Sequence, residues 1–463
     1  MAGALAYLTL LYPSLHQTLK LRAHRARLPP GPKTGKTGLA KPWLYFRELS
    51  AQYGDVVSVP GLGAGPTIVL GSARAAWDLL ERRGSIYSSR PRFVVGGELL
   101  SGGLRGLMAP YGGFWRRWRR LLHSGFMQRR SVSYRPLQAL ESAVLVGDLL
   151  RRPDGFRGHL ERYAASVTVL VTYGRRVTDV AGDEVVRRNI EAMGRLTSVN
   201  IPGKYAAERY PALKYVPAMF APWKAEVLQQ RQKDIQLYMD LLNDTKDKVV
   251  RGVATPCFAT HLLEEQEALG MSDLELAYTA GSPFGAGIET TAGTLASFFL
   301  ACVKFGQHFI PRAQEELDRV VGRDRLPTFE DMEDLEYVRA VAAETFRWRP
   351  VAVLGGTPHA STADDVYNGM FIPKGSTIVA PLWTIHLNEN DFPEPHEFKP
   401  ERFLEDRDFP GTLGHTAFGW GRRICPGMHL GAASVNLNIA RILWAFNVAP
   451  AKDEAGQDID VDM

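Results

Sequence analysis

Helical hydrophobic spacing dominates the sequence from about Ala73 to Phe346, and no β-rich block of comparable size occurs. Strand signals are confined to two places. They are β-branched runs around a glycine turn at 55–71, and apolar runs at 364–386 that flank the hairpin dipeptide Asn368-Gly369. With 463 residues, 45% of them hydrophobic, the chain can bury a large core. The sequence predicts a mainly α fold with a small β portion, organised as one large helical domain.

The charge and cysteine content argue against two classes of protein. The net charge is only +5, and no block of alternating aromatic and basic residues resembles a stacking platform for bases, so we expect no nucleic-acid partner. The three cysteines, Cys257, Cys302 and Cys425, are far apart in the sequence, which argues against a disulfide framework and fits a reducing compartment. Cys257 and Cys302 stand in apolar surroundings and are expected to be small buried hydrophobes.

The first 27 residues combine an apolar run at 2–15 with basic residues between 20 and 27. The run is shorter than the roughly 20 residues of a membrane-spanning helix and contains Pro13, and no small-residue cleavage site follows it. We expect residues 1–27 to form a short interfacial or partial anchor, with a frayed amphipathic start as the alternative. If the run inserts, the basic residues keep the main domain, 28–463, on the cytosolic side.

A long helix is predicted from Asp273 to about residue 305, begun by a capping box of Ser272 and Glu275. Its middle contains Pro283 and several glycines, directly before an acid and two hydroxyls at 289–291. A kink there would free a carbonyl and leave room for water or a small molecule. The alternative is a glycine packing seam followed by a solvated turn.

The stretch "YGGFWRRWRRLLH" places Trp115 and Trp118 on one side of a helix. Arg119 lies one turn from Trp115 and could reach an anion that the indole also contacts. The alternative is an amphipathic helix with a basic outer face, which is the interpretation we prefer for Arg116, Arg117 and Arg120.

A second charged pattern is "ETFRWRP", in which Glu344 and Arg347 are three residues apart and share a helix face. Arg402, from "KPERF", could complete a cluster with them. Taken alone, such a pair is more often a surface salt bridge worth less than about 1 kcal/mol.

The stretch "FGWGRRICPGMHLG" carries the most specific signal. Cys425 stands just before an apolar helical run and just after Arg422 and Arg423, and both a helix N-terminus and nearby cations lower a thiol pKa. Gly421 and Gly427 allow a tight turn and leave space for a flat ligand against the sulfur. Zinc would need more ligands at close spacing, and a nucleophile would need a base. One thiolate, one flat ligand and cations for its acid groups together describe haem.

This stretch resembles the cysteine-ligand signature of the cytochrome P450 family, F-x-x-G-x-R-x-C-x-G, at every fixed position: Phe418, Gly421, Arg423, Cys425 and Gly427. Four further family motifs precede this signature, in the order typical of the family and over nearly the whole chain: W-x-x-x-R (Trp115, Arg119), A-G-x-E-T-T (Ala286 to Thr291), E-x-x-R (Glu344, Arg347) and P-E-R-F (Pro400 to Phe403). The sequence at 347–377 is most similar to that of fungal microsomal members of the family, including the O-methylsterigmatocystin oxidoreductase-like ones.

The resemblance implies a cytochrome P450 fold that binds haem b, iron protoporphyrin IX, with Cys425 as the proximal iron ligand. It implies that Glu289 and Thr290 hold dioxygen and relay protons. It also implies that the Glu344 cluster is structural. The remaining cofactor-binding residues that it implies are Trp115, Arg119, His359 and Arg423 for the propionates, Phe418, Gly421 and Gly427 in the ligand loop, and Ala286 and Gly287 on the long helix.

The implied activity is that of a haem-thiolate monooxygenase acting on a lipophilic small molecule, with electrons from NADPH-cytochrome P450 reductase. The implied location is the endoplasmic reticulum membrane surface, with the catalytic domain in the cytosol. The chain stops at "KDEAGQDIDVDM", where family members continue through a β hairpin, so we expect that hairpin to be missing. The alternatives are a haem-thiolate isomerase or dehydratase, and a non-catalytic truncated haem protein.

Overall fold

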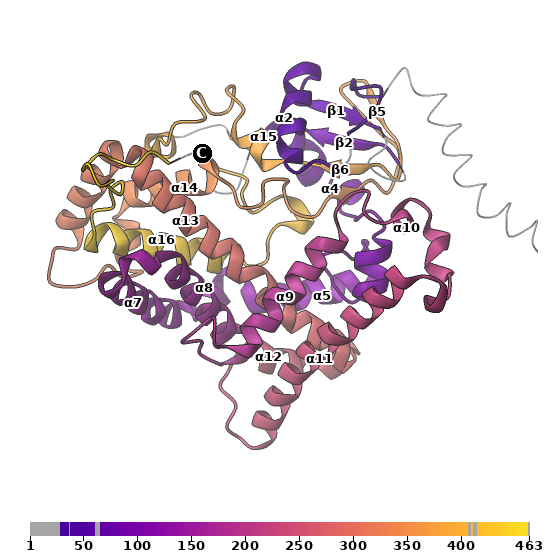
Figure 1. Ribbon diagram of the computed structural model, residues 1–463, viewed down its shortest axis with the longest axis horizontal. Helices are drawn as coiled ribbons and strands as arrows, with labels where there is room; N and C mark the ends of the chain where they lie inside the picture. The colour runs from indigo at the N-terminus through magenta and orange to yellow at the C-terminus, as the bar shows by residue number, and fades with distance from the viewer. Residues whose placement is uncertain (1–27, 37, 61–64, 406–408, 411–413, 462–463) are drawn as a thin grey trace, which may run out of the picture.

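The computed structural model describes residues 28–36, 38–60, 65–405, 409–410 and 414–461 (Figure 1). The predicted anchor at 1–27 lies outside the described residues. The helices are α2 (Pro42–Tyr53), α3 (Ala73–Ala76), α4 (Gly84–Tyr87), α5 (Gly113–Phe126), α6 (Gln128–Val132), α7 (Arg135–Arg151), α8 (Phe156–Tyr173), α9 (Glu184–Val199), α10 (Ala206–Arg209), α11 (Pro222–Val250), α12 (Phe258–Leu269), α13 (Asp273–Val320), α14 (Glu336–Trp348), α15 (Leu382–His386) and α16 (Met428–Ala445).

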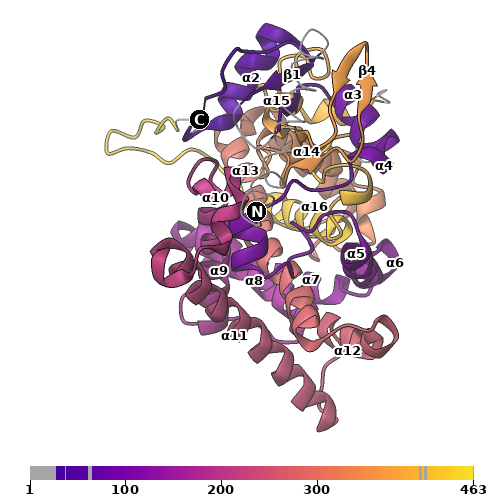
Figure 2. The ribbon, with the colours of Figure 1, turned by 90° about the vertical axis from the view of Figure 1, so that its right-hand side faces the viewer.

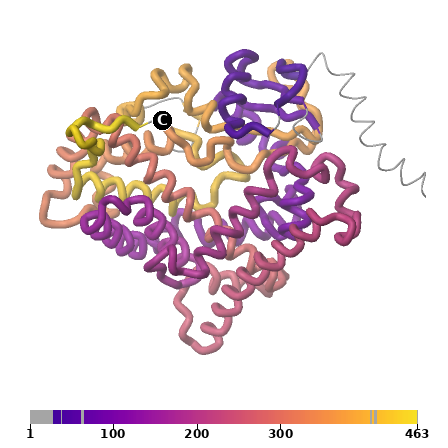
Figure 3. Tube along the Cα trace, viewed as in Figure 1, coloured from indigo at the N-terminus to yellow at the C-terminus, as the bar shows by residue number. Residues whose placement is uncertain are grey.

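The β portion is small, as predicted. Its main sheet has the order β1-β2-β6-β3, formed by β1 (Val56–Val59), β2 (Thr67–Leu70), β6 (Thr377–Val379) and β3 (His359–Ala360). β1 and β2 form the predicted antiparallel pair, and β2 runs parallel to β6, with Thr67 opposite Thr377. Figure 3 shows the consequence: indigo N-terminal chain and orange C-terminal chain lie side by side in this part of the molecule.

A second, two-stranded sheet pairs β4 (Asp365–Tyr367) with β5 (Met370–Ile372). The turn between them is the predicted dipeptide, and Asn368 and Gly369 have φ angles of 49° and 76°. Glycine, and less readily asparagine, tolerates this left-handed region, which explains the hairpin signal in the sequence.

The central helix of the fold is α13, which packs against α8, α11, α14 and α16 in the largest core cluster (Figure 1). The predicted capping box is present, because Ser272 accepts from the backbone of Glu275 while Glu275 accepts from that of Ser272. Among the described residues α13 is the one helix long and apolar enough to cross a membrane. Its packing on all these neighbours is that of a core helix.

One expectation for α13 is wrong, because the helix runs to Val320 instead of ending near Phe305. As predicted, it is one helix that includes Pro283. The glycines fit the packing-seam alternative, since a Cβ at Gly285 would lie 2.7 Å from the sulfur of Met193 and one at Gly287 would lie 2.7 Å from Oγ1 of Thr168. Tight contact with α9 and α8 supports the helix where its own propensity is low.

The final described residues leave the helical body as an extended yellow excursion (Figure 2). Within it the backbone N–H of Asp453 donates to Gln457 at 2.8 Å, and that of Ile459 donates to Ala451 at 2.7 Å. The division into 1–27 and 28–463, and the missing further hairpin, stay predictions.

Candidate functional site

Cys425 lies in a tight loop directly before α16. Its backbone N–H donates to the carbonyl of Phe418 at 2.9 Å, which closes the loop. Gly421 has a φ of 57°, and a Cβ there would lie 2.3 Å from the carbonyl oxygen of Leu80, so only glycine fits. A Cβ at Gly427 would lie 3.9 Å from Sγ of Cys425, within ordinary van der Waals contact of the sulfur.

The charge environment of Cys425 differs from the prediction. Burial raises the pKa of the thiol, while the backbone N–H of Gly427 and the guanidinium of Arg119 lower it. The expected net lowering is therefore wrong for the chain alone, because the loss of water outweighs both favourable terms. Arg422 and Arg423 are not the cations that act on the sulfur. Arg422 turns outward and donates to the hydroxyl of Tyr111 at 2.8 Å.

Arg423 occupies the space between the cysteine loop and α5. Its guanidinium lies 4.2 Å from the ring centroid of Trp115 and donates to the carbonyls of Ser88 at 2.7 Å and Ala109 at 2.8 Å. Arg119 donates to the carbonyl of Ile424, next to Cys425, at 2.6 Å. Trp115 and Arg119 thus both contact the cysteine loop, and their role at the propionates stays a prediction.

The structure adds Arg90, which sequence reasoning missed. It is buried and donates to the carbonyls of Leu107 at 3.1 Å and Pro358 at 3.0 Å. Burial lowers the pKa of Arg90 to about 9. Burial also lowers that of Arg423 to about 9, with further lowering by the charges of Arg90 and Arg119. Arg423 is therefore close enough to both Arg90 and Arg119 to be repelled by their charges.

His359, on β3, belongs to the same cluster. Burial, and then the charge of Arg90, lower its pKa to about 3, so it is neutral in the chain alone. Because the carbonyl of Tyr87 accepts from Nδ1 at 2.9 Å, the proton is on Nδ1 and Nε2 presents a lone pair. An anion bound beside it would raise this pKa and make Nε2 a donor.

The positive charges of this cluster are not matched by a carboxylate from the described residues. Within the described part of the chain, Arg90, Arg119 and Arg423 have only carbonyl acceptors, and no carboxylate is paired with any of them. Nε1 of Trp115 is also buried without a hydrogen-bond partner there. Buried unpaired cations are costly, so an acidic ligand is expected between them. The two propionates of haem, bound beside a thiolate, fit this donor set.

One face of α13 is open although the helix is central. Ala286, Glu289 and Thr290 are exposed, while Ile288 beside them is buried. The hydroxyl of Thr290 donates to the carbonyl of Ala286 at 2.7 Å, so that carbonyl has a hydrogen-bond partner. Gly287 faces α8, as described above, and not this open face. α13 also packs on α16, the helix that directly follows the cysteine loop.

The Glu344 cluster lies next to the cysteine loop, on the side of α14. Glu344 and Arg347 are both fully buried, and Arg402 lies 3.4 Å from Oε1 of Glu344, so the surface salt-bridge interpretation is wrong. Phe346, between them on α14, packs on Phe418 with ring centroids 5.1 Å apart. The cluster is thereby one aromatic contact from the loop that carries Cys425.

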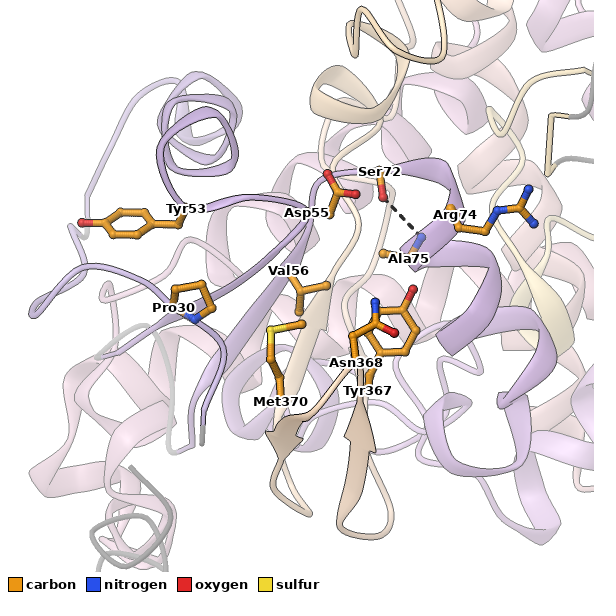
Figure 4. A pocket seen from close by; sticks show the side chains of 10 residues that line it. All are labelled: Pro30, Tyr53, Asp55, Val56, Ser72, Arg74, Ala75, Tyr367, Asn368 and Met370. Carbon is orange, nitrogen blue, oxygen red and sulfur yellow. Dashed lines mark hydrogen bonds between the residues drawn. The ribbon is translucent and has the colours of Figure 1, made fainter. Parts of the chain in front are cut away.

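A cavity of about 210 Å³ lies elsewhere, in the β portion (Figure 4). Its lining includes Tyr53, Asp55, Arg74 and Tyr367, and it contains none of the predicted site residues. Ser72, also in its wall, is already used as the N-cap of α3, accepting from the backbone of Ala75 at 3.3 Å.

The outer face of α5 is basic, as predicted for Arg116 and Arg120 but not for Arg117. Arg116 and Arg120 are exposed. Arg117 instead reaches back to Glu275 at 3.5 Å, so its charge is partly neutralised at the start of α13.

Comparison with known proteins gives a consistent result. A family profile described as "Cytochrome P450" matches residues 32–463. The chain is 37% identical over 448 residues to cytochrome P450 monooxygenase 58 of Postia placenta, covering 94% of this chain and 84% of that protein. It is 37% identical over 464 residues to a cytochrome P450 monooxygenase of Armillaria gallica, covering 96% and 87%. A solved zebrafish cytochrome P450 with abiraterone has a TM-score of 0.68 at 25% identity, covering 87% of this chain and 91% of that one. The O-methylsterigmatocystin oxidoreductase-like subtype stays a prediction.

Proposed function

The chain belongs to the cytochrome P450 family and is a haem-thiolate monooxygenase, and on this basis we propose that Cys425 is the ligand of the haem iron. Haem, when bound, supplies the activation of dioxygen by which one oxygen atom enters a substrate and the other is reduced to water. The observation that carries the residue assignment is the unpaired cation cluster beside the cysteine loop. Arg90, Arg119, His359 and Arg423, with Nε1 of Trp115, would hold the propionates.

The ligand loop positions the sulfur in this proposal. Gly421 and Gly427 allow the turn, and the Gly427 N–H is directed at the sulfur. Phe418, which packs on Phe346 of α14, would shield the sulfur. Charge-assisted donors of this kind favour the thiolate over the thiol once the site is filled.

Glu289 and Thr290 would hold and move protons on the open face of α13. The Thr290 hydroxyl donates to Ala286 in the chain alone, and rotation about one bond would turn it toward a ligand on that face. The exposed carboxylate of Glu289 is free to exchange protons with water. Ala286 would border the ligand.

The redox partner proposed is NADPH-cytochrome P450 reductase, docking on the basic face formed by Arg116, Arg120 and Arg129. All three are exposed on α5 and α6. Arg119, also on α5, donates to the carbonyl of Ile424 next to Cys425. An acidic reductase surface would be steered to such a patch.

The proposed location is the cytosolic surface of the endoplasmic reticulum membrane. The connection between α9 and α11 exposes large apolar side chains, of which Tyr215, Met219 and Phe220 are each more than 70% exposed. Exposed Lys204 and Arg209 lie in the same connection. An apolar patch fringed by basic residues suits a bilayer surface with anionic headgroups.

The test of the proposal is the carbon monoxide difference spectrum of the reduced protein, compared between the unaltered chain and Cys425→Ala. A thiolate-ligated Soret band in the first and its loss in the second are expected, with oxygenation lost together with the band. Cys302→Ala, a change at a buried cysteine outside the loop, should keep the band. Oxygenation that survives in Cys425→Ala would refute the assignment. Neither the isomerase nor the truncated-protein alternative is favoured, because the relatives are named monooxygenases and the family profile spans 32–463.

A further inference from the structure

His386, the last residue of α15, is fully buried and contacts α14 through two hydrogen bonds that run in opposite directions. Its Nδ1 lies 3.1 Å from the carbonyl oxygen of Arg347, and the guanidinium of Arg347 donates to the carbonyl of His386 at 3.0 Å. Because a carbonyl oxygen can only accept a hydrogen bond, Nδ1 carries the ring proton. The imidazole is thus fixed against the main chain of α14.

The other ring nitrogen faces the chain that leads into the cysteine loop. Nε2 of His386 accepts from the backbone N–H of Thr416 at 3.2 Å and lies 2.9 Å from the hydroxyl oxygen of the same residue. Since a backbone N–H can only donate, Nε2 is the unprotonated nitrogen, and the hydroxyl of Thr416 is a second donor to it. Burial, and then the neighbouring His415 and Arg347, hold the pKa of His386 well below its ordinary value, which agrees with a neutral ring.

Thr416 begins the turn that presents a carbonyl to Cys425. The backbone N–H of Gly419 donates to the carbonyl of Thr416 at 2.9 Å, which closes a turn with Phe418 at its third position. The carbonyl of Phe418 accepts from the backbone N–H of Cys425, and this bond closes the cysteine loop. A displacement of Thr416 would therefore move the carbonyl that holds Cys425.

The residue before Thr416 is attached to the same helix by packing. The ring of His415 stacks on Phe346 of α14, with ring centroids 5.2 Å apart. Consecutive residues of α14 thus hold consecutive residues at the entry to the cysteine loop. The two attachments differ in kind, because a ring stack tolerates sliding whereas hydrogen bonds fix both distance and direction. The chain of bonds through His386 is therefore the attachment that defines the place of Thr416.

We infer that His386 is a positioning residue for the cysteine loop, through which α14 sets the place of Thr416. The turn that begins there then sets where Cys425 is held. The helix is a firm reference, because Arg347 is fully buried and paired with Glu344. The hydrogen bonds belong to the chain itself, and their effect on the iron ligand rests on the proposed function.

The direct test is native-state hydrogen exchange of the full, cofactor-loaded chain, with two variants that each reproduce one ring nitrogen. The amide nitrogen of Asn takes about the place of Nδ1, whereas the amide oxygen of Gln reaches about the place of Nε2 and can accept from Thr416. His386→Asn should speed exchange of the Cys425 amide about tenfold relative to amides of α13, and His386→Gln by less than about threefold. Unchanged exchange in His386→Asn, or equal acceleration in both variants, would overturn the inference.

Thr416 provides an independent disruption, because His386→Asn leaves a small cavity and could fail to fold. Thr416→Val removes the hydroxyl donor while keeping the backbone N–H and nearly the same side-chain shape. It should speed exchange of the Cys425 amide about threefold, and Thr416→Ser, which keeps the hydroxyl, should leave the rate unaltered. Identical rates in the Val and Ser variants would contradict the role of this bond.

The carbon monoxide difference spectrum of the reduced protein tests the effect on the iron ligand. His386→Asn should raise the fraction of the inactive form, which has a shifted band, severalfold, and His386→Gln should keep the thiolate band. The matched control is His159→Asn on α8: His159 is also buried, with Nε2 2.8 Å from the carbonyl oxygen of Arg152, and its change should leave that fraction unaltered. An unaltered band in His386→Asn, or an equal shift in the control, would refute the effect on the ligand. A missing thiolate band in the unaltered chain, with the exchange results as expected, would count against the proposed function alone.

Discussion

Glu344 accepts two hydrogen bonds from the guanidinium of Arg347, at 2.6 and 2.7 Å, and neither side chain has any exposed surface. The remaining donors of Arg347 reach the carbonyls of His386, Pro395 and Glu397. The pair therefore fastens α14 to the long irregular chain that leads toward the cysteine loop. Every donor is used, which is the condition under which a buried ion pair is tolerated.

Glu344→Gln should destabilise the fold by about 3–5 kcal/mol, because it leaves the buried charge of Arg347 without its counter-ion. The free energy of unfolding in urea measures this. Asp244→Asn, which breaks the exposed Lys248–Asp244 pair, is the control and should cost less than about 0.5 kcal/mol. Equal losses in the two variants would contradict the assignment of Glu344 as a buried structural residue.

Arg119→Gln should release haem about tenfold faster or more, because a charge-assisted hydrogen bond to a propionate is worth about 1.5–3 kcal/mol. Transfer of haem to apomyoglobin, followed by absorbance, measures the rate. Arg120→Gln changes the neighbouring residue on the exposed face of the same helix and should leave the rate unaltered. Identical rates in the two variants would count against the propionate assignment.

Thr290→Ala should raise NADPH consumption per molecule of product severalfold, since the hydroxyl that guides protons on the open face of α13 is lost. The ratio of NADPH oxidised to product formed is the measurement. Thr294 makes the same kind of bond one turn later, to the carbonyl of Thr290, but is buried. Thr294→Ala should retain the coupling, and unchanged coupling in Thr290→Ala would argue against a proton-relay role.

Replacing Arg116 and Arg120 together by Gln should raise the apparent KM for the reductase about threefold to tenfold at low salt and weaken its salt dependence. Arg117 is left out because it pairs with Glu275. The control removes two exposed charges elsewhere, Arg251 and Arg319, at the same net charge. Reductase kinetics that respond equally to both double variants would indicate a net-charge effect and no docking site.

Asp331 should make stability depend on acid pH. Hydrogen bonds from Arg325 lower its pKa from 3.8 to about 2, with further lowering by Thr328. A lowered folded-state pKa means that the stabilisation is complete above about pH 4 and is lost as the pH falls toward 2. Since Arg325 is half exposed, water screens the pair, and we expect about 1 kcal/mol. The stability difference between the unaltered chain and Asp331→Asn should shrink as the pH falls from about 4 toward 2. A constant difference over that range would contradict this origin.

The sequence was sufficient wherever the required residue type is dictated by the local backbone. Gly421 must be glycine because of its positive φ and the carbonyl of Leu80, and Asn368-Gly369 must form a tight turn. The cysteine loop could therefore be predicted from its local amino-acid sequence. Cys257 and Cys302 were also correctly expected to be buried, since both stand in apolar runs.

Features that depend on residues distant in the chain could not be predicted from the local sequence. Arg90 stands in "SSRPRF", which has no chemical signal, and it acquires a role only because folding brings it to Arg423. Gly287 has no side chain to indicate its direction, and the position of α8 decides which neighbour it meets. The prediction of a lowered thiol pKa is wrong for a related reason. The pKa of Cys425 is raised by burial, and burial depends on everything packed around the loop.

The parallel pairing of Thr67 with Thr377 has a consequence for biosynthesis. The β1–β2 hairpin leaves the ribosome early, but one of its edges stays unpaired until the far strand has been made. At about 5–20 residues per second this wait is about 15–60 s. An open edge is a site for wrong pairing with other chains, so the nascent protein depends on shielding by helices or chaperones during that time. Cys425, the proposed iron ligand, is translated later still, so on that proposal the cofactor is bound only after the β2–β6 pairing has become possible.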